Sequence, residues 1–265
     1  MKYSKTAICI SGEVRTAIEA YPSFKNFFEG MDVDVFIHTW TTTVVNTKTM
    51  DEPIIIQEDE EKINKIKELY QPKKILVEDQ MNVGEYESFS RMFYSIMMSN
   101  QLRLDYELEN DCLYEWVVKY RFDVIFPRDV KFPKMMMEKR VLYYPLGNQG
   151  IAKEECGAHG ISDIIFWGDS QIMTILCDSY RHYKYNLMKA LKSSLNGIYY
   201  SRDINKSLYS PGQIIYKRAI EHNIRPCELR PNGLFLPHTL WRSDVKELDP
   251  LNDYEKIKDR YNRDA

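Results

Sequence analysis

Residues 6–15 read TAICISGEVR, an apolar run that stops at Ser11-Gly12 and leads into a polar segment. Apolar side chains then recur near helical spacing over residues 17–28, so the stretch predicts a strand, a tight turn and a helix. Glycine lets the backbone approach a ligand closely, and a helix N-terminus favours an anion. We therefore consider Ser11, Gly12 and Arg15 candidate ligand-binding residues, with a plain turn carrying a surface arginine as the alternative.

The same alternation of strand and helix continues through the first half of the chain. Further strands are expected over residues 33–37, 74–77 and 115–120, with helices over 58–70 and 85–109. This order predicts an α/β fold with a mostly parallel sheet and helices on both faces. The polar stretch over 41–53 reads as a long loop.

The second half is less regular but continues the pattern without a linker or a repeat. It predicts strands over 141–144, 163–167, 224–229 and 233–236, a loop over 147–160, and helices over 170–191, 211–222 and 253–261. We therefore expect a single domain over residues 1–265.

Composition excludes several classes of protein. The 265 residues are 44% hydrophobic and 28% charged, which is a globular mixture rather than a disordered, collagenous or coiled-coil one. The net charge of -3 gives no basic surplus, so nucleic acid is not an expected partner.

Targeting signals are also lacking in this reading. The five cysteines are scattered and form no CxxC pair, which disfavours a disulfide scaffold or a zinc site and indicates a reducing compartment. The apolar run AICI is too short for a signal-peptide core, and no run approaches the ~18 apolar residues of a membrane helix. We expect a cytoplasmic protein without an integral membrane segment, in the host cytoplasm if its origin is viral.

Two further strand ends carry chemically useful residues. The second predicted strand ends in His38-Thr39-Trp40, where the indole can stack on a base and His38 can donate to a phosphate. A buried histidine with a structural partner is the alternative. The fourth strand ends in Arg121-Phe122-Asp123, and the period of two along a strand puts Arg121 and Asp123 on one face. Asp123 can hold Mg²⁺ or Mn²⁺, and Arg121 can balance a phosphate, while a simple Arg–Asp ion pair is the alternative reading.

Taken in order, these segments resemble GT-A-type glycosyltransferases, and more narrowly the WavE-like lipopolysaccharide and capsule glycosyltransferases that also occur in phage and large-virus genomes. The matching stretches span about residues 5–175 and read CISGEVRT, VDVFIHTW, RMFYSIMMSNQL, YEWVVKYRFDVIF and ISDIIFWGDSQIM. The resemblance implies a GT-A-like domain in which residues 1–125 bind a nucleotide-sugar donor and residues 126–265 form the acceptor side.

The resemblance also assigns roles to single residues on the donor side. It implies that Ser11, Gly12 and Arg15 meet the nucleotide. Arg91 can reach the donor from the long helix, with a solvated charge on the helix surface as the alternative. The Arg121–Asp123 segment occupies the place of the Asp-x-Asp motif of many relatives, with arginine in the first position. That departure leaves one carboxylate to hold a metal.

On the acceptor side, the resemblance makes Asp163 the first choice for a sugar-binding or base role. Asp169 is the second choice and can equally cap the helix that begins near residue 170. Gln213 stands near the place of an acid found in relatives, and an amide cannot act as a general base. His238 is a candidate metal ligand or phosphate contact, with an ordinary loop residue as the alternative.

The expected function is transfer of a sugar from a nucleotide-diphosphate donor to a hydroxyl of a glycan or lipid-linked glycan acceptor. One alternative is a protein that binds a nucleotide sugar without turnover. Another is a different nucleotide-using α/β transferase, such as a nucleotidyltransferase or methyltransferase. The first loop matches neither the P-loop pattern nor GxGxxG, which disfavours kinases and dinucleotide enzymes.

Overall fold

The computed structural model describes most of the chain. It covers residues 6–45, 54–57, 60–83, 88–133, 137–145, 161, 163–185, 211–229, 239–240, 249 and 251–256. Within these ranges, no helix combines the length and the apolar character that crossing a bilayer would need. Cys9, Cys112, Cys177 and Cys227 carry free thiols.

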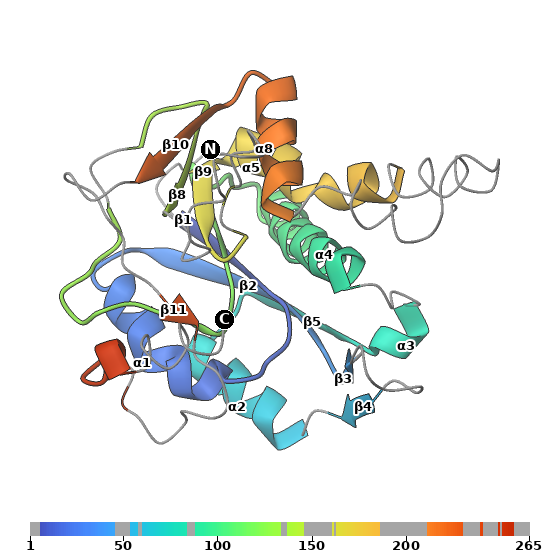
Figure 1. The fold of residues 1–265 in the computed structure, drawn as a ribbon, viewed down its shortest axis with the longest axis vertical. Coiled ribbons are helices and arrows are strands. Elements are labelled where there is room, and N and C mark those ends of the chain that lie inside the picture. The colour runs from blue at the N-terminus through green and yellow to red at the C-terminus, as the bar shows by residue number, and fades with distance from the viewer. Residues whose placement is uncertain are drawn as a thin grey trace.

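A mixed sheet of seven strands forms the centre of the molecule (Figure 1). In spatial order the strands are β10 (Arg225–Leu229), β8 (Val141–Pro145), β9 (Phe166–Asp169), β6 (Trp116–Tyr120), β1 (Thr6–Ser11), β2 (Val33–Trp40) and β5 (Lys74–Glu78). Strand β9 runs antiparallel to both of its neighbours, whereas the remaining paired strands are parallel. The expected mostly parallel α/β sheet is therefore confirmed.

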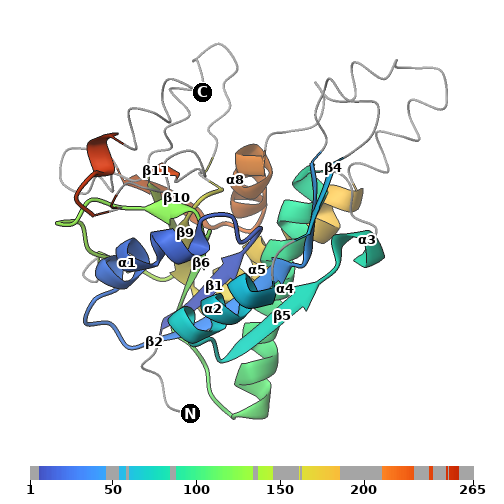
Figure 2. The same cartoon turned by 90° about the horizontal axis from the view of Figure 1, so that it is seen from below.

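Helices cover both faces of this sheet, as the two perpendicular views show (Figure 2). One face carries α1 (Ala17–Phe27) and α2 (Glu60–Tyr70), and the other carries α4 (Ser88–Glu109), α5 (Ser170–Cys177) and α8 (Pro211–Glu221). The alternation of side chains along β1 explains the two cores. Ile8 and Ile10 pack with α1, while Ala7 and Cys9 pack with α4.

A buried arginine ties α5 to α4. Arg103 is fully buried, donates to both carboxylate oxygens of Glu107 at 2.8 Å, and reaches Ser170 and Thr174 at 2.7 Å each. Buried charges need such complete pairing because desolvation is expensive. This network holds the junction of β9 and α5 against the long helix, and thereby places the loop that precedes β9.

The structure corrects three of the expected elements. The helix expected over 170–191 is interrupted, because α5 ends at Cys177 and residue 178 is a turn. Part of the supposed loop over 41–53 is strand β3 (Thr42–Val45), which pairs with β4 (Ile54–Gln57) beside the short helix α3 (Gln80–Val83) (Figure 1). The strand expected over 163–167 begins three residues later, at Phe166, because the carbonyl groups of residues 163 and 164 accept from a lysine instead of joining the sheet.

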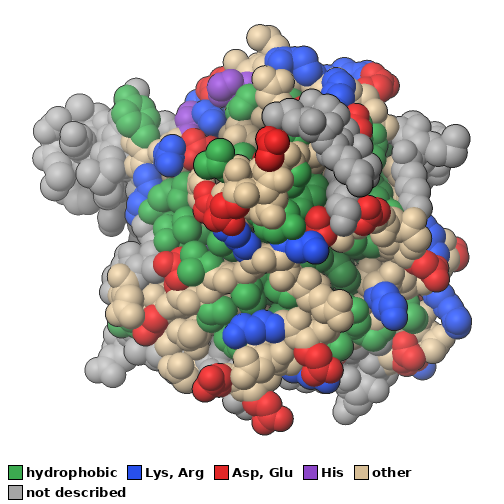
Figure 3. Space-filling model, turned by 180° about the vertical axis from the view of Figure 1, so that it is seen from behind, with side chains coloured by type: hydrophobic (Ala, Val, Ile, Leu, Met, Phe, Trp, Pro, Cys, Tyr) green, Lys and Arg blue, Asp and Glu red, His purple; other side chains and the backbone are tan. Residues whose placement is uncertain are grey.

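Smaller elements complete the described chain. Strands β7 (Val124–Ile125) and β11 (Thr239–Leu240) form an antiparallel pair, and residues 254–256 are helical. The loop expected over 147–160 and the strand expected over 233–236 lie outside the described residues. On the face drawn in Figure 3, acidic and basic side chains are interspersed with apolar ones over the described surface.

Candidate functional site

The sheet contains one point from which the chain winds in both directions. Strand β1 lies between β2 and β6, so the connections leave it toward β2 on one side and return to β6 on the other. In open α/β sheets, such a switch point leaves a crevice at the carboxyl ends of the strands, where ligands bind. The residues that follow β1 and β6 here are those of the Ser11–Arg15 and Arg121–Asp123 segments.

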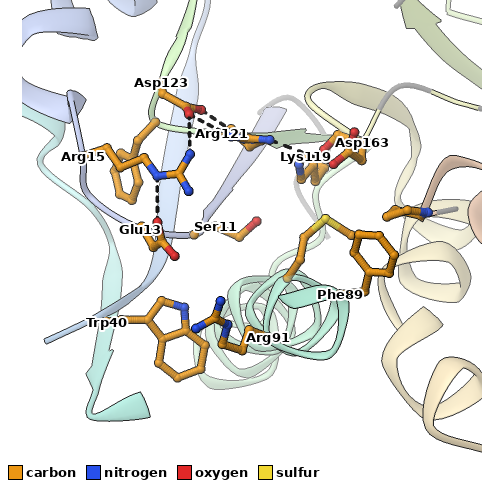
Figure 4. Close-up of a pocket in the computed structure, with 14 residues that line it drawn as sticks. Ser11, Glu13, Arg15, Trp40, Phe89, Arg91, Lys119, Arg121, Asp123 and Asp163 are labelled. Atoms are coloured by element: carbon orange, nitrogen blue, oxygen red, sulfur yellow. Dashed lines mark hydrogen bonds and ion pairs between the residues drawn. The ribbon is translucent and has the colours of Figure 1, made fainter. Parts of the chain in front are cut away.

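A cavity lies at this point, and most of the predicted site residues line it (Figure 4). The structure brings together seven of them: Ser11, Gly12, Arg15, Arg91, Arg121, Asp123 and Asp163. Trp40 also lines the cavity, as do six residues to which the sequence analysis gave no role: Glu13, Phe89, Met92, Lys119, Phe122 and Pro211.

The loop after β1 holds Arg15 in an unusual backbone conformation. Gly12 has φ +120°, and Arg15 has φ +25°, a value that costs a non-glycine residue about 1–3 kcal/mol. Strand β2 fixes this loop, since the Gly12 amide donates to the His38 carbonyl at 3.3 Å and Thr39 Oγ1 donates to the Gly12 carbonyl at 2.8 Å. Arg15 Nε donates to Glu13 at 2.7 Å.

Asp123 is almost completely buried between two guanidinium groups. Arg121 donates to it twice, from Nε to Oδ1 at 3.0 Å and from Nη2 to Oδ2 at 2.7 Å. Arg15 Nη1 lies 3.4 Å from the same Oδ2. Burial works to lower the pKa of Arg121, but the Asp123 carboxylate outweighs it and raises that pKa above its ordinary value. Arg121 and Arg15 therefore present positive charge to the cavity with Asp123 between them.

This arrangement does not fit a divalent cation at Asp123. Both carboxylate oxygens are engaged by arginine, so a metal would have to displace a guanidinium from a buried ion pair. Within the part of the chain that the structure describes, no group of three or more His, Cys, Asp and Glu side chains is placed to hold a metal ion. His238 lies outside the described residues.

Lys119 is a site residue that the sequence analysis missed. It is fully buried on β6, lines the cavity, and donates to the main-chain carbonyls of Asp163 and Ile164, the latter at 3.2 Å. Burial lowers the pKa of Lys119 to about 7, against the opposing effect of Asp163. Its signal in the sequence was a single charge inside the otherwise apolar run Val117–Tyr120.

The two acids of the ISDIIFWGD stretch have different environments. Asp163 lines the cavity with about a quarter of its side chain exposed (25%), and its Oδ2 lies 4.0 Å from Arg121 Nη1. Asp169 caps α5 instead, accepting from the amides of Gln171 and Ile172 at 3.1 Å each. Of the two readings for Asp169, the structure supports the helix cap.

His38 does not line the cavity. It is fully buried, with Nδ1 2.7 Å from Ser95 Oγ and Nε2 2.8 Å from Glu78 Oε2. Burial lowers its pKa despite the hydrogen bond to Glu78. The structure thus gives His38 the surroundings of the structural alternative, beside Trp40, whose ring stacks on Tyr94 at 5.7 Å.

The long helix supplies the remaining cavity wall. Arg91 extends from α4 toward the cavity beside the Trp40 indole, and Phe89 lies across the cavity from Arg15 (Figure 4). Pro211, the first residue of α8, also lines the wall. Gln213 is on the same helix, and its side chain lies outside the described part of the structure.

Comparison of the chain with protein-family models and with curated proteins returned no match. The function is therefore inferred from the geometry of the cavity and from the residues that line it.

Proposed function

We propose that the protein is a GT-A-type glycosyltransferase that uses a nucleotide-diphosphate sugar as donor. The observation that carries the proposal is that Arg15 and Arg121 both contact Asp123 in a cavity at the carboxyl ends of β1 and β6. Open α/β sheets bind nucleotides at such a place. The mostly parallel sheet agrees with the Rossmann-like fold that the resemblance implies.

The charge of the cavity suits the chemistry of the leaving group. Departure of a nucleoside diphosphate concentrates negative charge on the phosphate that the sugar leaves, and fixed cationic donors stabilise that charge in the transition state. Arginine matches phosphate oxygens with two parallel N–H donors. Arg15 and Arg121 come from different strand ends, so they can contact the same diphosphate from two sides.

An acid from a third segment faces Arg121. The Asp163 carboxylate lies on the loop before β9, and a carboxylate near the reacting carbon can take the proton of an acceptor hydroxyl. Phe89, Met92 and Pro211 give the cavity an apolar wall, on which the carbon-bound hydrogens of a sugar ring can pack. Asp163 would then act on the acceptor while the arginines hold the donor.

A ligand panel tests this proposal. Purified protein is mixed with uridine, guanosine, cytidine and thymidine diphosphate sugars, S-adenosylmethionine and nucleoside triphosphates, and its unfolding temperature is measured. We expect a rise with at least one nucleotide sugar or its nucleoside diphosphate, which is then followed as donor hydrolysis and as transfer to a glycan acceptor. Stabilisation by S-adenosylmethionine or a triphosphate alone would reject the proposal. If the donor binds but is neither hydrolysed nor used to glycosylate any glycan offered, the protein is a nucleotide-sugar-binding protein without turnover.

A further inference from the structure

We infer that the cavity binds its diphosphate through the triad Arg15–Asp123–Arg121 without a divalent cation, and that Asp123 is a positioning residue for the two arginines. The inference rests on the proposed function, and it names the groups that meet the pyrophosphate. It also departs from the metal-binding role that the sequence suggested for Asp123.

Both carboxylate oxygens of Asp123 are engaged by arginine. Its side chain is 3% exposed, and each oxygen accepts from Arg121, Oδ1 from Nε and Oδ2 from Nη2. Oδ2 also faces Arg15 Nη1 at 3.4 Å. A cation that approached this carboxylate would meet two positive charges within hydrogen-bond distance of the oxygens it needs, which opposes its binding.

The ion pair with Asp123 leaves one end of the Arg121 guanidinium for a ligand. Asp123 occupies the edge of Arg121 formed by Nε and Nη2. The remaining terminal nitrogen, Nη1, is 4.0 Å from Asp163 Oδ2, which is beyond hydrogen-bond distance, and Arg121 lines the cavity. Because the Asp123 carboxylate binds one edge of the Arg121 guanidinium, Nη1 is left to donate to a ligand in the cavity.

The two arginines come from different strand ends. Arg15 follows β1 and Arg121 follows β6, and Asp123 contacts both although it is 108 positions from Arg15 in the chain. Arg15 also keeps a positive φ of 25° in this position. A strained residue held by a distant carboxylate is a sign of pre-organisation for a ligand. Two fixed guanidinium groups then supply the positive charge that a metal ion would bring.

The test measures binding of uridine diphosphate, guanosine diphosphate and inorganic pyrophosphate by calorimetry, once with EDTA and once with Mn²⁺. We expect at least one probe to bind in EDTA with a Kd within about threefold of its value in Mn²⁺. Binding that needs Mn²⁺, or gains more than about tenfold from it, would overturn the inference while leaving the proposed function intact. Failure of every probe under both conditions would count against both.

Variants separate positioning from metal binding. Asp123→Asn keeps the shape of the side chain but loses its charge, and we expect it to weaken binding in EDTA by about tenfold or more. The matched control is Asp105→Asn on the exposed face of α4, which should bind like the wild type. If Asp123→Asn does not fold, Arg121→Lys is tested in its place. Lysine keeps the positive charge but cannot donate two parallel hydrogen bonds to Asp123. Unchanged binding in EDTA by the folded variant contradicts the positioning role.

Discussion

The ammonium group of Lys119 donates a hydrogen bond to the main-chain carbonyl of Asp163, the residue whose carboxylate faces Arg121 at 4.0 Å. A buried strand residue thereby holds the backbone of an acid that lines the cavity. Lys119 is fully buried, and desolvation lowers its pKa to about 7. Holding its ammonium group in this position therefore costs free energy of folding. The cost has a measurable dependence on pH.

Stability should rise with pH through the range in which only the unfolded chain keeps Lys119 protonated. The pKa of Lys119 falls from 10.5 to about 7 on folding, so the unfolded chain binds more protons between these values. The free energy of unfolding then increases with pH by up to about 1.4 kcal/mol per unit. Urea unfolding between about pH 7 and 8.5 measures the slope, below the range in which the raised pKa of buried Cys9 opposes it.

Lys119→Met removes the titrating group, so its slope over that range should be smaller than that of the wild type. Lys65→Met, at an exposed lysine on α2, is the matched control and should keep the wild-type slope. Equal slopes for Lys119→Met and the wild type would show that Lys119 has an ordinary pKa in the folded protein.

Asp163→Asn should separate donor binding from transfer. The amide keeps the shape of the side chain but cannot take a proton, so transfer should fall by about two orders of magnitude or more. Because the arginines remain, donor binding by calorimetry should stay within about threefold of the wild type. Asp178→Asn, at a partly exposed acid at the end of α5, is the control. Full activity in Asp163→Asn would remove this acid from the mechanism.

Asp169→Ala should lower stability without affecting the cavity. The change removes the side-chain acceptor for the amides of Gln171 and Ile172 and for the amide of Arg140 at 2.6 Å. Loss of such a helix cap costs about 1–2 kcal/mol in the free energy of unfolding. Asp169→Ser, which can still cap, should recover part of the loss. A donor-binding defect in a stably folded Asp169→Ala would instead support the second-choice site role.

His38→Leu decides between the two readings of this histidine. The substitution leaves Glu78 and Ser95 without the ring that contacts them, and we expect a loss of about 1–3 kcal/mol in the free energy of unfolding. Donor affinity of the folded protein should change little, because His38 does not line the cavity. The opposite pattern, normal stability with lost binding, would restore His38 as a phosphate contact.

Gly12→Ala tests the loop conformation after β1. A Cβ at Gly12 meets no atom within 4 Å, so the penalty comes from the backbone, whose φ of +120° suits glycine alone. We expect a loss of about 1–3 kcal/mol in stability, or a shifted loop with weaker donor binding. Gly30→Ala, at φ +69° after α1, is the control and should lower stability while donor affinity stays unchanged.

Much of the sheet could be predicted because hydrophobic periodicity is a local property. The apolar runs that became β1, β2, β5 and β6 were bounded within a few residues, and the helices between them followed from three- and four-residue spacing. The predicted start of β9 was wrong because a tertiary contact determines where this strand begins. The carbonyls that could have extended the strand accept from Lys119. Strand β3 was missed because its polar threonines look like a loop until a partner strand is present.

The sequence by itself determined the order of strands and helices and, through the rule that parallel strands end at one edge, the meeting of Arg15, Arg121 and Asp123. Only the tertiary structure decided which charged groups pair with one another and which are buried. Asp123 pairs with both arginines, Lys119 is buried beside Asp163, and His38 is enclosed by side chains far away in the chain. The reason is physical. Periodicity is written in neighbouring residues, whereas desolvation and ion pairing depend on which distant groups the folded chain brings within a few ångströms.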